Sequence, residues 1–343
     1  MPVPFLFFRR AALAVSLSVP LSLVAAPAAA APLTASGLAL VVNDDDPNSV
    51  AVAEAYRLAH KVPEQNIAHV SIPNSPRRLT AKQFAALKER IDAQLGPDVE
   101  AVLMVWTAPY AVECNAITSA FTLGFDAAQC DTPCGPGKPS PYFDRPAGLP
   151  RTEPGRRLSM LLPTQSVPLA KALIARGTAR NFQLPQATAY FLVTSDKARS
   201  SRASTFPPSG QVPQKNLAVR TLFADVLEDK ADVMLYQTGL ARVDKLETLR
   251  FLPGALADHL TSTGGDLLGD AQMSSLRWLE AGATASYGSV SEPCNYWQKF
   301  PHGKVLLRNY LAGDTALEAY WKSVAWPTQG VFIGNPLAAP YRR

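Results

Sequence analysis

The chain has 343 residues, of which 47% are hydrophobic and 18% are charged, and its formal charge is +5 at neutral pH. A chain of this length can bury a large core, either as one large domain or as a domain with an insertion. The positive excess is small, and no run of lysine and arginine with interleaved aromatic residues occurs. The composition therefore argues against a protein that binds nucleic acid.

The first 31 residues are typical of a secretory signal peptide. Arg9 and Arg10 precede the apolar stretch "AALAVSLSVPLSLVAAPAAAA", which ends in small residues. Because Pro32 disfavours a cut directly before it, we predict cleavage between Ala26 and Ala31, most simply by the Sec route. The alternative is an uncleaved membrane anchor. Residues 1–31 contain two arginines and no acidic residue, so their removal lowers the formal charge to +3.

No later segment approaches the roughly 18 uninterrupted apolar residues of a membrane-spanning helix. The sequence therefore predicts that the mature chain, 32–343, does not span the membrane. An exported chain of this kind belongs in the periplasm, outside the cell or at the cell surface.

The mature sequence begins with alternating strands and helices. Apolar runs predict buried strands at 38–42, 67–72 and 99–106. Asp46 or Asn48 can cap a first helix, and Thr80 can cap a second. Continuous apolar strands separated by amphipathic helices are typical of a parallel sheet that is covered on both faces.

The alternation is interrupted from about residue 114 to 157, where proline and glycine are frequent. A loop of this length is either functional or an insertion tied by its cysteines. The pattern then resumes, with strands predicted at 158–162, 188–194, 231–239, 284–290 and 330–334, and helices near 166–176, 270–283 and 303–323. We predict one three-layer α/β domain over 32–343, Rossmann-like or caspase-like, with a mainly parallel sheet and a cysteine-containing insertion at 114–157.

The chain has four cysteines, Cys114, Cys130, Cys134 and Cys294. An even number in an exported protein favours disulfides, and four cysteines allow three connectivities. We expect Cys130 and Cys134 to be bonded to each other or each to lie within reach of another cysteine, because their loop is too rich in proline and glycine to be held by packing. A Cys114–Cys294 bond is the main competitor of any catalytic role for Cys294.

His259 and Cys294 are the candidate catalytic pair. The stretch "DHLTSTGGD" precedes the helix that leads into the strand at 284–290, and Cys294 follows that strand. Ligands of parallel sheets bind beyond the carboxyl ends of the strands. We therefore expect both side chains at the carboxyl-end edge, within about 10 Å of each other.

A cysteine becomes a strong nucleophile beside a base that lowers its pKa. In this hypothesis His259 is the base, Asp258 or Glu292 orients its ring, and amides near Gly264 and Gly265 stabilise an oxyanion. The alternative is a structural histidine and a disulfide-bonded cysteine.

The layout of strand, histidine loop, helix, strand and cysteine is similar to that of the caspase- and gingipain-like cysteine peptidases. In those enzymes the histidine typically lies in a His-Gly turn directly after its strand. Here that turn reads Thr238-Gly239, and His259 follows twenty residues after Gly239. The similarity therefore concerns the order of the elements and not the motif.

Three adjacent aspartates, Asp44, Asp45 and Asp46, follow the first predicted strand. Carboxylates at a strand end suit Mg²⁺ or Ca²⁺, but they can equally cap the next helix at its positive end. No zinc spacing, G-x-G-x-x-G loop, P-loop or G-x-S-x-G elbow occurs, so the sequence predicts no nucleotide or other cofactor.

Four segments carry a resemblance to a known family: "ECNAITSAFTLGFD", "FLPGALADHLTSTGG", "QMSSLRWLEAGATASYGSVSEPCNYWQKFP" and "EAYWKSVAWPTQGVFIGNPLAAPY". They resemble an uncharacterised family of exported bacterial proteins that occurs in genomes encoding exosortase, the membrane enzyme that sorts proteins with a PEP-CTERM tail. The resemblance covers nearly all of the mature chain and implies an envelope context. The family has no established activity, so it assigns no catalytic residue. The chain ends "PLAAPYRR", without a PEP-CTERM tail, which favours a protein that accompanies the sorting system over one of its cargoes.

Two functions follow from these features. The first is an exported hydrolase of the cysteine peptidase or transpeptidase type. The second is a non-catalytic binding or assembly protein for sorted surface proteins or exopolysaccharide. For the second, Tyr296, Trp297, Tyr320, Trp321 and Trp326 could stack on sugars, or they could belong to the core.

Overall fold

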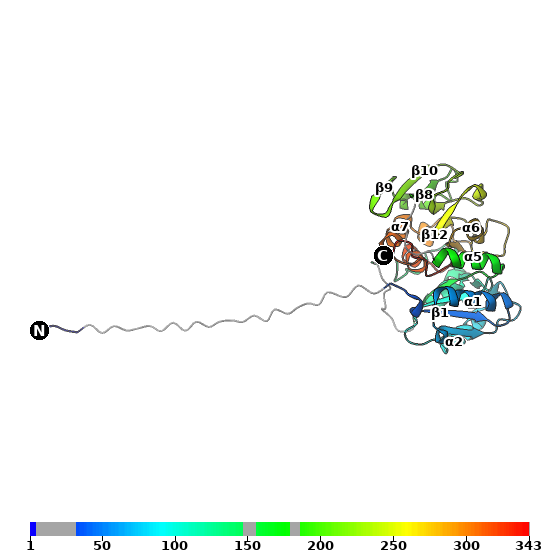
Figure 1. The fold of residues 1–343 in the computed structure, drawn as a ribbon, viewed down its shortest axis with the longest axis horizontal. Helices are drawn as coiled ribbons and strands as arrows, with labels where there is room; N and C mark the ends of the chain where they lie inside the picture. The colour runs from blue at the N-terminus through cyan, green and yellow to red at the C-terminus, as the bar shows by residue number, and fades with distance from the viewer. Residues whose placement is uncertain (5–31, 147–155, 179–185, 343) are drawn as a thin grey trace.

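The computed structural model describes residues 1–4, 32–146, 156–178 and 186–342. It confirms the predicted class, because an eleven-stranded, mainly parallel sheet lies between layers of helices (Figure 1). Most of the predicted signal peptide, residues 5–31, lies outside the described residues, as do residues 147–155 of the predicted insertion.

The elements have the following bounds. The large sheet contains β1 (Leu38–Asn43), β2 (Ile67–Val70), β4 (Ala101–Val105), β7 (Leu158–Leu161), β8 (Ala187–Val193), β9 (Gly210–Val212), β10 (Leu217–Phe223), β11 (Val233–Thr238), β12 (Phe251–His259), β13 (Ala285–Ser289) and β14 (Gly330–Gly334). A small sheet contains β3 (Arg78–Leu79), β5 (Ala111–Val112) and β6 (Asn115–Ala116). The helices are α1 (Pro47–His60), α2 (Ala81–Asp92), α3 (Ile117–Leu123), α4 (Ala128–Asp131), α5 (Val167–Thr178), α6 (Leu276–Ala281), α7 (Gly303–Ala312) and α8 (Ala316–Ser323).

The large sheet consists of two parallel blocks that run in opposite directions. Its order is β2-β1-β4-β7-β14-β13-β12-β11-β8-β10-β9. The central strand β14 is parallel to β7 but antiparallel to β13. From its outer edge inward the first block has the order β2-β1-β4-β7. Without the antiparallel edge strand β9, the second block has the order β10-β8-β11-β12. In both blocks the strand that comes second in the sequence is therefore outermost, followed by the first, third and fourth. The carboxyl ends of the two blocks therefore lie on opposite edges of the sheet.

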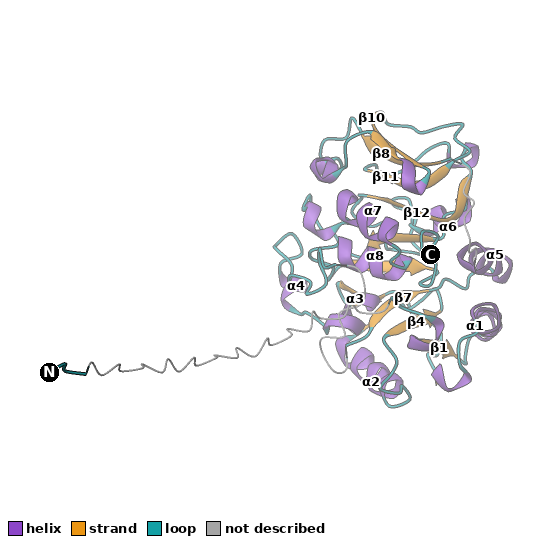
Figure 2. Cartoon of the chain, turned by 60° about the vertical axis from the view of Figure 1, so that its left-hand side comes forward, coloured by secondary structure: helices purple, strands orange, loops and turns teal. Residues whose placement is uncertain are grey.

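Helices cover both faces of the sheet. Figure 2 shows α1, α5 and α6 on one side of the strands and α2, α3, α7 and α8 on the other. The predicted caps are confirmed where they can be tested: the Asp46 carboxylate accepts a hydrogen bond from the Asn48 amide at the start of α1, and Thr80 forms a capping box with Gln83 at the start of α2. Within the described residues, no helix is long and apolar enough to cross a bilayer.

The first part of the predicted insertion belongs to the core. Helix α3 packs against β7 and β14, and its Ile117 and Phe121 side chains are buried. The irregular part begins after this helix and is fastened to α8 and the segment after it, because the Ser140 amide donates to the Ala325 carbonyl and the Asp144 amide to the Lys322 carbonyl. Within the predicted segment, the irregular part therefore begins after Leu123, where α3 ends.

Strand β12 corrects the prediction that His259 lies in a loop, because the strand extends through His259. The sequence did not predict this buried strand because its apolar run is interrupted by Pro253, Gly254 and Asp258. Gly254 has a φ of +86°, and a Cβ atom there would lie 2.9 Å from the Pro340 ring. Only glycine fits both the backbone conformation and the contact.

Leu33 marks the start of the packed core. Its side chain is fully buried. Its amide donates to Glu318 Oε1 at 3.1 Å, and its carbonyl accepts from Arg342 at 2.8 Å. A cut after Leu33 would remove a core residue, so the predicted cleavage at or before Ala31 leaves these contacts intact.

Candidate functional site

All four cysteines form disulfides. Cys114 is bonded to Cys130, and Cys134 is bonded to Cys294, with Cα–Cα distances of 5.3 and 5.2 Å. This confirms that Cys130 and Cys134 each lie within reach of another cysteine. The competing Cys114–Cys294 pair is not formed. The Cys134–Cys294 bond ties the irregular segment after α3 to the loop that follows β13, and the Cys114–Cys130 bond ties the same segment to the turn between β5 and β6.

Cys294 is therefore not a thiol in this structure and cannot attack a carbonyl. Glu292 has a local role, because its exposed carboxylate accepts a hydrogen bond from the Cys294 amide at 2.8 Å. The catalytic assignment of Cys294 and the orienting role of Glu292 do not agree with this bond, because a disulfide leaves no thiolate for a base to activate.

His259 does not have the surroundings of a general base. Its Nδ1 atom accepts a hydrogen bond from Trp278 Nε1 at 2.9 Å, and its Nε2 atom donates to the Met273 carbonyl at 3.1 Å. Burial lowers the pKa of His259 from 6.5 to about 3, so the ring is neutral at physiological pH. Strands β12 and β13 are parallel, so the segments that follow them leave at the same edge of the sheet, whereas the expected separation of about 10 Å between the His259 and Cys294 side chains stays a prediction.

The buried neutral state of His259 predicts how stability depends on pH. Between pH 6.5 and 3 the unfolded chain binds a proton at this site and the folded chain does not, so stability falls as the pH falls through this window. We expect this one site to contribute a slope of up to about 1.4 kcal/mol per pH unit. Urea unfolding of the wild type and of His259→Gln between pH 4 and 7 measures it. The variant should show a shallower slope than the wild type. Equal slopes in the two proteins would contradict the assignment.

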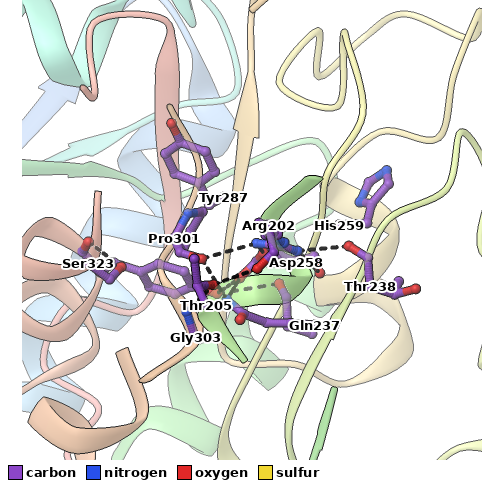
Figure 3. A network of polar contacts seen from close by, with 12 residues as sticks. Arg202, Thr205, Gln237, Thr238, Asp258, His259, Tyr287, Pro301, Gly303 and Ser323 are labelled. Carbon is purple, nitrogen blue, oxygen red and sulfur yellow. Dashed lines mark hydrogen bonds and ion pairs between the residues drawn. The ribbon is translucent and has the colours of Figure 1, made fainter. Parts of the chain in front are cut away.

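Asp258 lies at the centre of a buried polar network. Its carboxylate forms an ion pair with Arg202, and both side chains are only 1% exposed. Figure 3 shows Arg202 and Gln237 directed towards Asp258. Gln237 donates to Asp258 Oδ2 at 3.1 Å, and the Tyr320 hydroxyl donates to the same oxygen at 3.3 Å. Burial raises the pKa of Asp258, and the Arg202 charge opposes this change. Asp258 thus stabilises an internal charge and does not orient the His259 ring.

The segment that carries Arg202 fills the carboxyl ends of the second block. Arg202 lies in the 3₁₀ helix Ser201–Thr205, and its guanidinium also donates to the Thr238 carbonyl at 2.8 Å. The Thr194 hydroxyl donates to the Gly239 carbonyl at 2.7 Å. A Cβ atom on Gly239 would lie 1.9 Å from the Arg199 carbonyl oxygen, so the packing here requires glycine. The crevice where such sheets bind ligands is therefore occupied by the chain itself.

The carboxyl ends of β1 and β4 are filled in the same way. The Ser49 hydroxyl donates to the Val105 carbonyl, and the Asn43 amide donates to the Ser49 hydroxyl. The Thr164 amide donates to the Thr107 hydroxyl at 2.9 Å. Short polar side chains thus close the crevice of the first block.

The three aspartates are not gathered into a metal site. Asp44 forms an ion pair with His69 at 2.8 Å, and Asp45 accepts from the Ser71 hydroxyl at 2.6 Å. Asp46 caps α1. Among the described residues, no group of three or more histidine, cysteine, aspartate or glutamate side chains is placed to hold a metal ion. The capping alternative is the one that the geometry supports, and these residues lie on the opposite edge of the sheet from the end of β13.

Of the two expected oxyanion amides, that of Gly265 is already bonded within the chain. The Gly265 amide donates to Ser289, and the Gly264 carbonyl accepts from the Ser275 amide. A Cβ atom on Gly265 would lie 2.4 Å from the Gly288 carbonyl oxygen. These glycines allow two segments of backbone to approach closely.

The five candidate aromatic residues divide into two groups. Tyr320 and Trp321 are fully buried, and Trp321 Nε1 donates to the Ser159 carbonyl. They belong to the core. Tyr296, Trp297 and Trp326 are half-buried, so part of each ring reaches the surface.

The half-buried rings make two groups of contacts, one between Tyr296 and Trp326 and one in which Trp297 contacts Phe143 and His302, two residues that the sequence did not single out. Trp297 lies 6.5 Å from Phe143 and 5.5 Å from His302 between ring centroids. Tyr296 lies 5.6 Å from Trp326. We call these five residues the aromatic face. Phe143 comes from the irregular segment, and the neighbouring aromatic pair in "SPYFDRP" is the signal that could have found it.

A disulfide, a lysine side chain and close packing hold the loops that carry the aromatic face in place. The Cys134–Cys294 disulfide lies two residues before Tyr296. Lys299 Nζ donates to the Pro133 carbonyl at 2.6 Å and lies 5.4 Å from the Tyr296 ring centroid. Burial lowers the pKa of Lys299 to about 8. A Cβ atom on Gly137 would lie 2.8 Å from Trp326 Cβ, which shows how closely the irregular segment packs against this ring.

Comparisons with known proteins identify no relative. No protein-family model, no curated protein and no solved structure matches the chain. The fold and the sites above are therefore the basis for any functional assignment.

Proposed function

We propose that the protein is an exported envelope protein that binds a polysaccharide chain on the aromatic face and performs no covalent chemistry at Cys294. One observation carries this proposal: half-buried aromatic rings are presented on loops that a disulfide holds in place. The same disulfide removes the nucleophile that the hydrolase hypothesis requires.

The chemistry of the aromatic face suits a sugar chain. Aromatic rings offer large apolar surfaces with little conformational freedom, and sugar rings present apolar C–H faces that can stack on them. Polar groups border the rings: Asp144 and Arg308 form an exposed ion pair next to Phe143 and His302. Such groups can exchange hydrogen bonds with sugar hydroxyls.

The cellular setting is part of the proposal. Two disulfides suggest an oxidising, exported environment. The sequence resembles a family that is found beside exosortase, and this resemblance supports a role in an envelope system for surface proteins or exopolysaccharide. In this setting the protein accompanies the system as a binding or assembly component.

The proposal predicts a binding defect on removal of one ring. We expect Trp297→Ala to weaken binding of an exopolysaccharide from an exosortase-encoding bacterium about two- to tenfold, because one aromatic contact contributes about 0.5–1.5 kcal/mol. Isothermal calorimetry on the purified mature protein measures the affinity. The control is Phe223→Ala, which removes an 88% exposed ring at the end of β10.

The control variant should bind like the wild type, and both variants should keep the wild-type unfolding transition. Equal affinities for Trp297→Ala and the wild type, or no binding by the wild type, would remove the proposal. A thiol titration of the native protein addresses the hydrolase hypothesis separately. We expect no reactive thiol, and one reactive thiol per chain would restore Cys294 as a candidate nucleophile.

A further inference from the structure

The crossover from β11 to β12 carries no α-helix. The chain leaves β11 at Thr238 and enters the parallel strand β12 at Phe251, and the intervening segment contains only the 3₁₀ helix Leu246–Thr248. Connections between parallel strands are usually α-helical. The helical layer is therefore thin beside α6, and a groove of about 670 Å³ lies between this crossover and the loop that leads into α6.

The groove has an apolar floor and a charged rim. Val243, Leu246 and Met273 line it and are buried. Its charged lining residues are all exposed and include both signs: Arg242, Lys245 and Arg277, and Asp244, Glu247 and Asp270. The volume lies within the range of about 300–1,000 Å³ that is typical of ligand sites.

Backbone and side-chain contacts fix the two walls relative to each other. The Met273 amide donates to the Ala241 carbonyl at 2.8 Å, and Arg242 donates to the Asp270 carbonyl at 2.6 Å. Gln272 Oε1 accepts from the Thr261 hydroxyl at 2.6 Å, which ties the loop to the end of β12. A groove held in this way needs little reorganisation to bind a ligand.

We propose that this groove binds a short peptide segment of another exported protein, with an apolar side chain on the floor and oppositely charged side chains on either side of it. The presence of both positive and negative side chains on the rim is the reason for choosing a peptide as the ligand. A polyanion would be repelled by Asp244, Glu247 and Asp270, and a neutral lipid has no charged groups to complement the exposed charges of the rim. A peptide supplies an apolar anchor and both charges in one chain. This site is independent of the aromatic face and of the polysaccharide proposal.

The test uses three fluorescein-labelled octapeptides. Each has a central leucine, flanked by lysine and then glutamate, by the reverse order, or by glutamine on both sides. Fluorescence anisotropy with the mature protein should show that one charged order binds at least threefold more tightly than the other and than the glutamine peptide. The double variant Lys245→Glu with Glu247→Lys keeps the net charge but exchanges two rim charges, so it should prefer the opposite order.

The matched control exchanges an ion pair of the first block, Glu54→Arg with Arg57→Glu on α1. It should keep the wild-type preference. The proposal fails if neither charged peptide binds more tightly than the glutamine peptide, or if the rim variant keeps the wild-type preference. Polysaccharide binding by the rim variant should be unchanged, so this result is distinct from a failure at the aromatic face.

Discussion

Replacing Arg202 by methionine is expected to lower the free energy of unfolding by about 3–5 kcal/mol. The substitution leaves the Asp258 carboxylate buried without its cationic partner, and it also removes the hydrogen bonds that Arg202 donates to the carbonyls of Thr238 and Asp258. Urea unfolding followed by tryptophan fluorescence measures the change at pH 7. The cost arises from an uncompensated buried charge and not from lost apolar contact.

Two further variants separate these causes. Arg202→Met combined with Asp258→Leu removes both charges and should recover a large part of the lost stability, because neither partner is then left unpaired. Arg57→Met removes one partner of an exposed pair on α1 and should cost much less, because solvent screens such a pair. A loss for Arg202→Met as small as that for Arg57→Met would show that the buried pair does not stabilise the fold.

Removing the Cys134–Cys294 disulfide is expected to cost more than removing Cys114–Cys130. The two bonds join residues 160 and 16 positions apart. By reducing the conformational entropy of the unfolded chain, a cross-link that closes a loop of the longer kind stabilises the fold by about 5 kcal/mol. A cross-link of the shorter kind stabilises it by about 3 kcal/mol. We therefore expect the variant with serine at positions 134 and 294 to be the less stable of the two double serine variants.

Calorimetric or urea unfolding of both double variants, each compared with the wild type under oxidising conditions, gives the two differences. The same variants separate stability from function, because only Cys134→Ser with Cys294→Ser releases the loop that carries Tyr296 and Trp297. It should bind polysaccharide less tightly even at temperatures where it is fully folded. An equal or smaller stability loss for the long-range bond would contradict the expected order.

Much of the fold could be predicted from the sequence, and the reasons are local. Apolar runs gave β1, β4, β8 and β14 to within a few residues, because strands that are buried on both faces contain few polar residues. Strand β12 could not be found in this way. Its Asp258 is compatible with burial only because Arg202, distant in sequence, supplies the opposite charge. The helix predicted at 270–283 is confined to α6, because the amides of Met273 and Ser275 donate to the carbonyls of Ala241 and Gly264 in other segments of the chain.

The candidate site was less predictable. The sequence indicated correctly that the segments after β12 and β13 leave by one edge of the sheet, since this follows from strand direction alone. It could not indicate which cysteine pairs with Cys294, because the partner, Cys134, lies in an irregular segment whose path depends on tertiary contacts. The sequence also could not show that Trp297 is half-buried at the surface whereas Trp321 belongs to the core, because the residues next to each tryptophan do not reveal how exposed its side chain is.

The position of β14 has a consequence for the order in which the molecule can assemble. It comes after all other strands in the sequence, yet it is the strand that joins the two blocks. Until residues 330–334 are in place, β7 and β13 each present an unpaired edge, which is a template for association with other chains. During synthesis the two half-sheets therefore cannot unite until the segment that forms β14 is present, and both edges are open to association with other chains up to that moment.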